Sequence, residues 1–180
     1  AVKDTPDKPV FVIHHEHIKY TVYGSYDEDG WGKILFADLL KKYPNVVDFS
    51  GHSHFPMNDP RSINQTTYTS VGVGAMARFE LDKNYIIGQH PEGYEDALQF
   101  AVIEADSQGR VRIRGFDVLS ETFFCDYFIE NVNDPDTYAY TYKNLKAHDE
   151  APSFPEKMTV SAKADTNGCY VLSFCNAEVT

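Results

Sequence analysis

The sequence predicts an α/β fold, and the prediction depends on two apolar strands and the helix between them. The continuous apolar run at Lys8–Ile13 is typical of a strand that is buried on both faces, and Val46–Phe49 predicts another short apolar strand. Within Leu35–Tyr43, apolar side chains recur at helical spacing, and Pro44 ends that helix. Strand, helix and strand in this order form a βαβ unit, which predicts that the two strands are parallel neighbours.

The elements that follow are mostly strands. Residues 58–62 have loop composition, and β character resumes at Thr67–Val71. Two β runs, Leu98–Ala105 and Val111–Leu119, are separated by a short turn sequence and predict a hairpin. Residues 126–148 are polar and rich in tyrosine, without a clear period, so no element is predicted there.

A domain boundary is predicted near residue 150. Residues 151–155 contain two prolines and have the composition of a stiff linker. Beyond them, residues 157–162 and 169–174 alternate apolar and polar side chains around Asp165–Gly168, which predicts a second hairpin. A lone hairpin is marginally stable, so residues 151–180 are expected to be a linker and the first hairpin of a following β domain.

Length and charge exclude several classes of protein. A chain of 180 residues is long enough to bury roughly two-thirds of its unfolded surface. The balance of 16 Lys and Arg against 27 Asp and Glu gives a net charge of −11, which argues against binding to a nucleic-acid backbone. No apolar run approaches the ~20 residues of a membrane helix, so no membrane association is expected.

Histidines gather where the two predicted strands end. Of the 7 histidines, five lie there, and they include the pairs His15-x-His17 and His52-x-His54, against about 0.3 such pairs expected by chance. The carboxyl ends of parallel strands lie along one edge of a sheet, where α/β folds bind their ligands. Imidazole is a common ligand of Zn, Fe, Mn and Ni, so the pattern predicts a metal site. The alternative is that these histidines only solvate the rim of the sheet.

These blocks also carry a family resemblance. The run Lys8–His15, followed by Gly51-His52-Ser53-His54, resembles the last two sequence blocks of the calcineurin-like metallophosphoesterases. The resemblance implies that His15 and His52 bind one ion of a two-metal centre and that His54 binds the other. His14 is the competing assignment for the ligand at the end of the first strand.

Residues around these blocks give further expectations. The family usually has proline after the strand-end histidine, whereas this chain has Glu16-His17, which would add a polar group to the pocket. Gly51 is expected to give the turn that carries both histidines an unhindered backbone. Asp48 and Asp59 are expected to be a strand-end side chain and a loop cap rather than metal ligands.

The family's earlier blocks, Asp-x-His, Gly-Asp-x-x-Asp and Gly-Asn-His, do not occur in this sequence. The resemblance therefore implies that residues 1–150 are the C-terminal half of a metallophosphoesterase β-sandwich with helices, α+β when taken alone. The start of a β-sandwich-like domain follows in residues 151–180. Such a half-domain exposes sheet edges, so the chain is expected to self-associate or to pair with the missing half.

The function implied is hydrolysis of a phosphate mono- or diester with two divalent ions, for which Mn, Fe, Zn and Mg all stay open. Three histidines leave both ions short of ligands, so we expect this chain to bind metal weakly and to be inactive alone. An appended β domain favours export from the cytoplasm. The alternative function, from a different class, is a non-catalytic α+β binding or assembly module with rim histidines.

Overall fold

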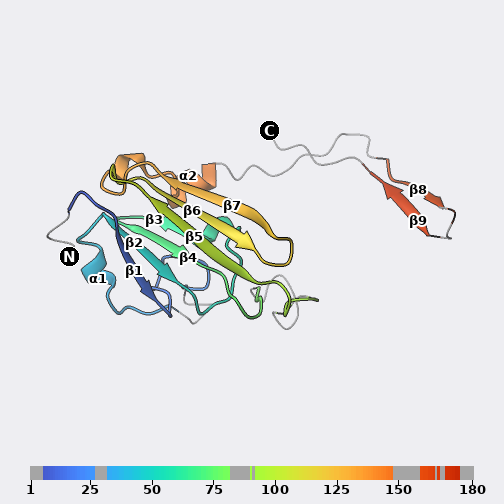
Figure 1. The fold of residues 1–180 in the computed structure, drawn as a ribbon, viewed down its shortest axis with the longest axis horizontal. Coiled ribbons are helices and arrows are strands. Elements are labelled where there is room, and N and C mark those ends of the chain that lie inside the picture. The colour runs from blue at the N-terminus through green and yellow to red at the C-terminus, as the bar shows by residue number, and fades with distance from the viewer. Residues whose placement is uncertain are drawn as a thin grey trace. The chain divides into compact units, whose positions relative to one another are not determined.

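The computed structural model describes residues 6–26, 32–81, 90, 92–147, 159–164, 166 and 169–174. The chain divides into two compact units, Ala1–Leu145 and Lys146–Thr180. Strands and a few short helices make up the described residues, so the fold is mixed α/β with the character of an α+β protein (Figure 1).

The first sheet of unit 1 carries the histidine blocks. Its strand order is β1-β2-β4-β3, formed by β1 (Val10–His14), β2 (Val46–Ser50), β4 (Thr69–Gly72) and β3 (Ile63–Gln65). Strands β1, β2 and β4 are parallel, and β3 pairs with β4 in the antiparallel sense. The parallel pairing of the first two strands is as predicted, whereas β3 falls in a stretch where no strand was expected.

The two predicted apolar strands differ in how deeply they are buried. All five residues of β2 are buried, because strands flank β2 on both sides and side chains cover both faces of the sheet. For β1 the prediction of burial on both faces is wrong: Phe11 is 41% exposed and Ile13 is 78% exposed. β1 lies at the edge of the sheet, so only the face with Val12 and His14 is partly covered.

The predicted helix is present but much shorter than expected. Helix α1 (Ala37–Leu40) is a single turn within the predicted range Leu35–Tyr43. Phe36 precedes it with a left-handed backbone, φ +66°, which stops the helix from starting earlier. Leu40 packs against a small apolar cluster on one face of the first sheet, which includes Val46.

A second, antiparallel sheet has the order β5-β6-β7, from β5 (Gln99–Ala105), β6 (Val111–Asp117) and β7 (Thr122–Ile129). The hairpin of β5 and β6 is confirmed. Strand β7 was not predicted, because a bulge opposite Gly115 and Phe116 interrupts its alternation of apolar and polar side chains.

The two sheets of unit 1 pack face to face (Figure 1). One buried cluster takes Val47, Phe49 and Val71 from the first sheet and Ile113 from the second. The hydroxyl of Tyr127 on β7 donates a hydrogen bond across the interface to the carbonyl oxygen of Met57.

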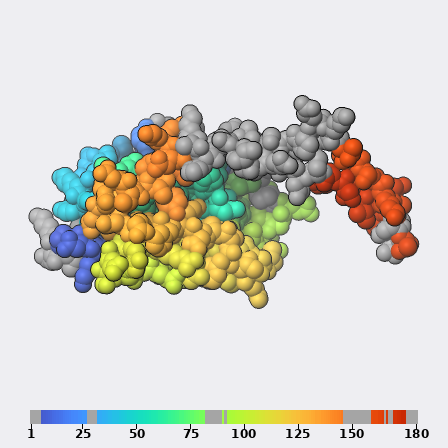
Figure 2. Space-filling model, turned by 90° about the horizontal axis from the view of Figure 1, so that it is seen from above, coloured from blue at the N-terminus to red at the C-terminus, as the bar shows by residue number. Residues whose placement is uncertain are grey.

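The segment after β7 connects the outer strands of both sheets. It contains a 3₁₀ turn, η2 (Pro135–Thr137), and helix α2 (Tyr142–Ala147). Tyr140 exchanges two hydrogen bonds with Gln65 of β3, and its hydroxyl accepts one from the backbone N–H of Phe128 on β7. In Figure 2 this orange segment lies against the yellow strands of the second sheet.

Unit 2 contains one hairpin, in which β8 (Ser161–Ala164) pairs with β9 (Tyr170–Ser173) in the antiparallel sense. Strand β9 falls within the predicted run 169–174, whereas β8 overlaps the predicted run 157–162 only at Ser161 and Ala162 and continues to Ala164. The predicted linker at residues 151–155 and most of the predicted turn lie outside the described residues. In the part of the chain that the structure describes, no helix has the length and hydropathy needed to cross a membrane.

The bond between Tyr127 and Met57 leads to the first prediction. Tyr127→Phe leaves a buried carbonyl without its donor, so the free energy of unfolding should fall by about 1–3 kcal/mol in urea denaturation. Tyr94→Phe is the matched control, since the hydroxyl of Tyr94 donates to Glu95 in an exposed contact. Equal stabilities of the two variants would show that this bond does not tie the sheets together.

Candidate metal centre

The parallel pairing of β1 and β2 brings the two histidine blocks to one edge of the first sheet. His14, the last residue of β1, is paired in register with Ser50, the last residue of β2. One residue further on, the backbone N–H of Gly51 donates to the carbonyl oxygen of His15 at 3.0 Å. The loops that leave both strands therefore start side by side.

His15 and His52 face each other across this edge. His15 Nε2 lies 2.9 Å from His52 Nδ1, and the two rings meet edge to face with centroids 4.8 Å apart. In the absence of an ion, one ring donates an N–H to the other. Burial lowers the pKa of His52, and the charge of His15 adds to this effect, so the ring of His52 favours its neutral form.

The separation of these nitrogens fits two ligands of one metal ion. Two imidazole nitrogens that each bind an ion at about 2.1 Å, at roughly a right angle, lie about 3 Å apart. Neutral imidazole is also the form that binds metals. Among the described residues, no three His, Cys, Asp or Glu side chains gather closely enough to hold an ion.

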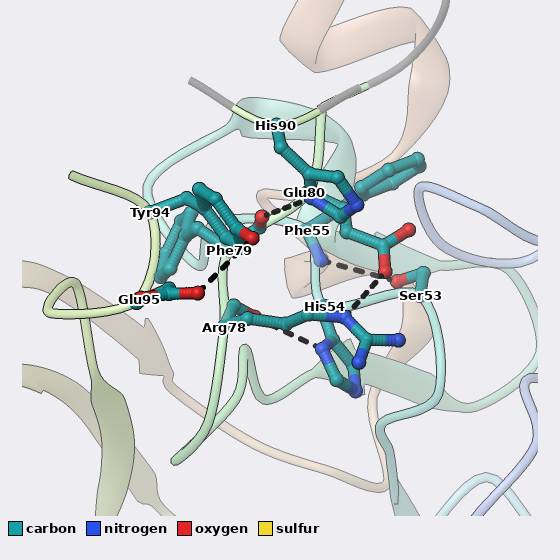
Figure 3. Close-up of polar contacts among 9 residues, drawn as sticks. All are labelled: Ser53, His54, Phe55, Arg78, Phe79, Glu80, His90, Tyr94 and Glu95. Carbon is teal, nitrogen blue, oxygen red and sulfur yellow. Dashed lines mark hydrogen bonds and ion pairs between the residues drawn. The ribbon is translucent and has the colours of Figure 1, made fainter. Parts of the chain in front are cut away.

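The ring of His54 lies in a different environment. Its Nδ1 donates to the carbonyl oxygen of Arg78 at 2.9 Å, and its own carbonyl accepts from the N–H of Glu80 (Figure 3). This bond leaves the lone pair of the neutral ring on Nε2. Metal-binding histidines commonly donate their second ring nitrogen to a backbone carbonyl in this way.

His14, the competing ligand, is occupied elsewhere. Its Nε2 lies 2.5 Å from Oδ1 of Asp48, a carboxylate with no exposed surface. The bond to Asp48 raises the pKa of His14, against the opposing effect of burial, so this ring favours its charged form. Successive side chains of a strand point to opposite sides, so His14 lies against the sheet and His15 is exposed.

The two aspartates expected not to bind metal have structural roles. Asp48 holds His14 as described, so it is a buried side chain rather than one at the strand end. Asp59 precedes the 3₁₀ turn η1 (Pro60–Ser62), where its carboxylate accepts from the N–H of Arg61 at 2.8 Å, so the predicted loop cap is confirmed.

His17 has a role that the sequence did not reveal. It is 1% exposed, and its ring nitrogens lie 2.8 Å from two hydroxyls, Nδ1 from Ser50 and Nε2 from Ser53. Burial is the main cause that lowers the pKa of His17 to about 3, so its ring is neutral at physiological pH. The available signal was the polar pair Glu16-His17 directly after His15, where the resembled family usually has proline.

The turn after β2 is strained at its histidines rather than at its glycine. His52 and His54 both have left-handed backbones, with φ of +69° and +57°. Gly51 does not, and a Cβ at Gly51 would meet only the carbonyl oxygen of His15, at 4.0 Å. The expectation that the turn needs glycine at position 51 for an unhindered backbone is therefore wrong.

In comparisons with known proteins, no protein-family model, no curated protein and no solved structure matches the chain.

The environment of His17 predicts an acid-sensitive fold. Its pKa is 6.5 in the unfolded chain and about 3 in the folded one, so below pH 6.5 the unfolded state binds the extra proton. The contribution of His17 to the free energy of unfolding is fully present above about pH 6.5 and decreases as the pH is lowered. At pH 5 this group alone reduces the free energy of unfolding by about 2 kcal/mol.

Urea denaturation at pH 7 and at pH 5 checks this, with His17→Gln as the variant that cannot titrate. The raised pKa of His14 acts in the opposite sense and is common to both proteins, so it cancels in the comparison. We expect the wild-type chain to lose about 2 kcal/mol more than the variant between these two pH values. The same loss in both proteins would contradict the account of His17.

Proposed function

We propose that this chain is the C-terminal part of a two-metal phosphoesterase that hydrolyses a phosphate mono- or diester. The observation that carries the proposal is the approach of His15 Nε2 and His52 Nδ1 to 2.9 Å from two separate strand ends. Two sheets packed face to face, with the histidines at the carboxyl edge of the parallel one, agree with the β-sandwich of the family that these motifs resemble.

In this proposal His15 and His52 hold one divalent ion, and His54 Nε2 contributes to a second. The bond from His54 Nδ1 to the carbonyl of Arg78 supports this role, because it fixes the tautomer that leaves Nε2 free to bind. The bond of His14 to Asp48 favours His15 over His14 as the strand-end ligand. When bound, the ions would supply an activated water and charge neutralisation for the phosphate.

The chain's own contribution is to orient these imidazoles, and its ligand set is incomplete. Metal sites in proteins usually have four or more ligands, whereas the proposal assigns two nitrogens to one ion and one to the other. Carboxylates from another segment would complete the site. The net charge of −11 does not oppose a phosphate ester, since bound cations are the largest local charges in such sites.

The rival function is a non-catalytic module whose histidines only solvate the sheet rim. The hydrogen bond between His15 and His52 alone would also suit that rival. Uptake of a divalent ion by this pair separates the two functions, because a rim histidine has no reason to bind metal in preference to another surface histidine.

Metal titration provides the test. We expect the wild-type chain to bind Co²⁺ weakly, with absorption changes typical of nitrogen ligands, and His52→Ala to lose that binding because one of two nitrogens is gone. His90→Ala is the matched control, since His90 bonds to the carbonyl of Phe79 in the group drawn in Figure 3. Equal binding by both variants, or none by the wild type, would refute the metal site.

Activity of the chain alone should be close to background. With Mn²⁺ added, we expect hydrolysis of p-nitrophenyl phosphate and of bis-p-nitrophenyl phosphate at the rate of Mn²⁺ in buffer, because neither ion has a full ligand set. Turnover at about 1 s⁻¹ or faster, the range of ordinary enzymes, would show that the described histidines suffice and that no further segment is needed.

A further inference from the structure

We infer that His17 is a positioning residue: through Ser50 and Ser53 it holds the Gly51–His54 turn so that His52 faces His15. The geometry that points to this role is a buried imidazole bonded at both nitrogens to hydroxyls on either side of Gly51 and His52. The inference deepens the proposed function and rests on it for its consequence in metal binding.

The Gly51–His54 turn contains left-handed backbone, which other contacts have to stabilise. Left-handed backbone is strained for a residue other than glycine, and His52 and His54 both adopt it on either side of Ser53. A hydrogen bond between buried groups contributes a free energy of the same order as this strain. The two bonds of His17 are therefore able to decide the conformation of the turn.

The bonding pattern at His17 is complementary at each atom. A neutral imidazole has one N–H donor and one acceptor nitrogen, so one serine hydroxyl accepts from the ring and the other donates to it. Ser50 belongs to β2, whose position is set by the sheet, whereas Ser53 belongs to the turn. His17 thus ties the turn to the strand that precedes it.

The same residue also ties together the two histidine blocks. His17 lies two positions after His15 in the first block, and its partners flank His52 in the second. Ser53 is further enclosed by Gly24, where a Cβ would come within 2.5 Å of the Cβ of Ser53. With Ser53 held from both sides, the ring of His52 leaves the turn toward His15, where the two nitrogens meet at 2.9 Å.

Two variants and one control variant test whether His17 holds the Gly51–His54 turn in place. Ser53→Ala removes one hydroxyl and is the mildest change, and His17→Phe keeps an aromatic ring but removes both nitrogens. Thr69→Val is the matched control: Thr69 has no exposed surface, its hydroxyl accepts one bond from Gln65, and it lies at the opposite end of the sheet. Each variant loses buried hydrogen bonding, so a general loss of stability would affect the control as well.

The first readout needs no metal. In crystal structures of the metal-free proteins, we expect the separation of His15 Nε2 and His52 Nδ1 to stay at hydrogen-bond length in the wild type and in Thr69→Val. In Ser53→Ala and His17→Phe it should exceed the hydrogen-bond limit of about 3.5 Å. An unchanged separation in both site variants would overturn the role of His17, whatever the metal does.

The second readout is the dissociation constant for Co²⁺. Groups that orient a metal ligand typically change affinity by 10- to 100-fold, so we expect about tenfold weaker binding in Ser53→Ala and no change in Thr69→Val. If Ser53→Ala and Thr69→Val weakened Co²⁺ binding equally, His17 would have only a structural role. A wild-type chain that binds no Co²⁺ would refute the proposed function, and the crystallographic separation would still decide the positioning role.

Discussion

The parallel pairing of β1 with β2, with His14 opposite Ser50, is the constraint on which the candidate site depends. It places the two segments that leave the strands next to each other, and the bond from Gly51 to the carbonyl of His15 continues the pairing beyond the sheet. A shift of this register by one residue would reverse the sides of His14 and His15. The buried His14–Asp48 pair opposes such a shift, because it would leave a carboxylate buried without its partner.

The fold could be predicted where burial on both faces gives a strong signal. The short apolar strand β2 is of this kind, whereas the hairpin of β5 and β6, which is partly exposed, was predicted from the turn sequence between its two β runs. Prediction failed where tertiary context overrides the local pattern. The composition of β1 does not reveal that it is an edge strand, and the left-handed Phe36 that shortens α1 has no local signature. Strand β3 has three residues, too few for a period, and β7 has a bulge.

The site was predicted as far as residue type and strand position allow. Two histidine pairs at neighbouring strand ends predicted that the blocks would meet, and the meeting of His15 with His52 follows from that reasoning. The choice between His14 and His15 stayed open in the sequence, because it depends on the side of the strand that Asp48 occupies. His17 was missed as an organising residue, since its two serine partners lie more than 30 positions away in the chain.

The central claim is that His15 and His52 bind the same divalent ion. Anomalous diffraction from crystals soaked in Mn²⁺ tests it directly, because it locates the ion without reference to activity. The account predicts a peak within about 2.0–2.4 Å of both His15 Nε2 and His52 Nδ1, with the two rings still facing each other. Rings that turn apart, with no peak between them at saturating Mn²⁺, would contradict it.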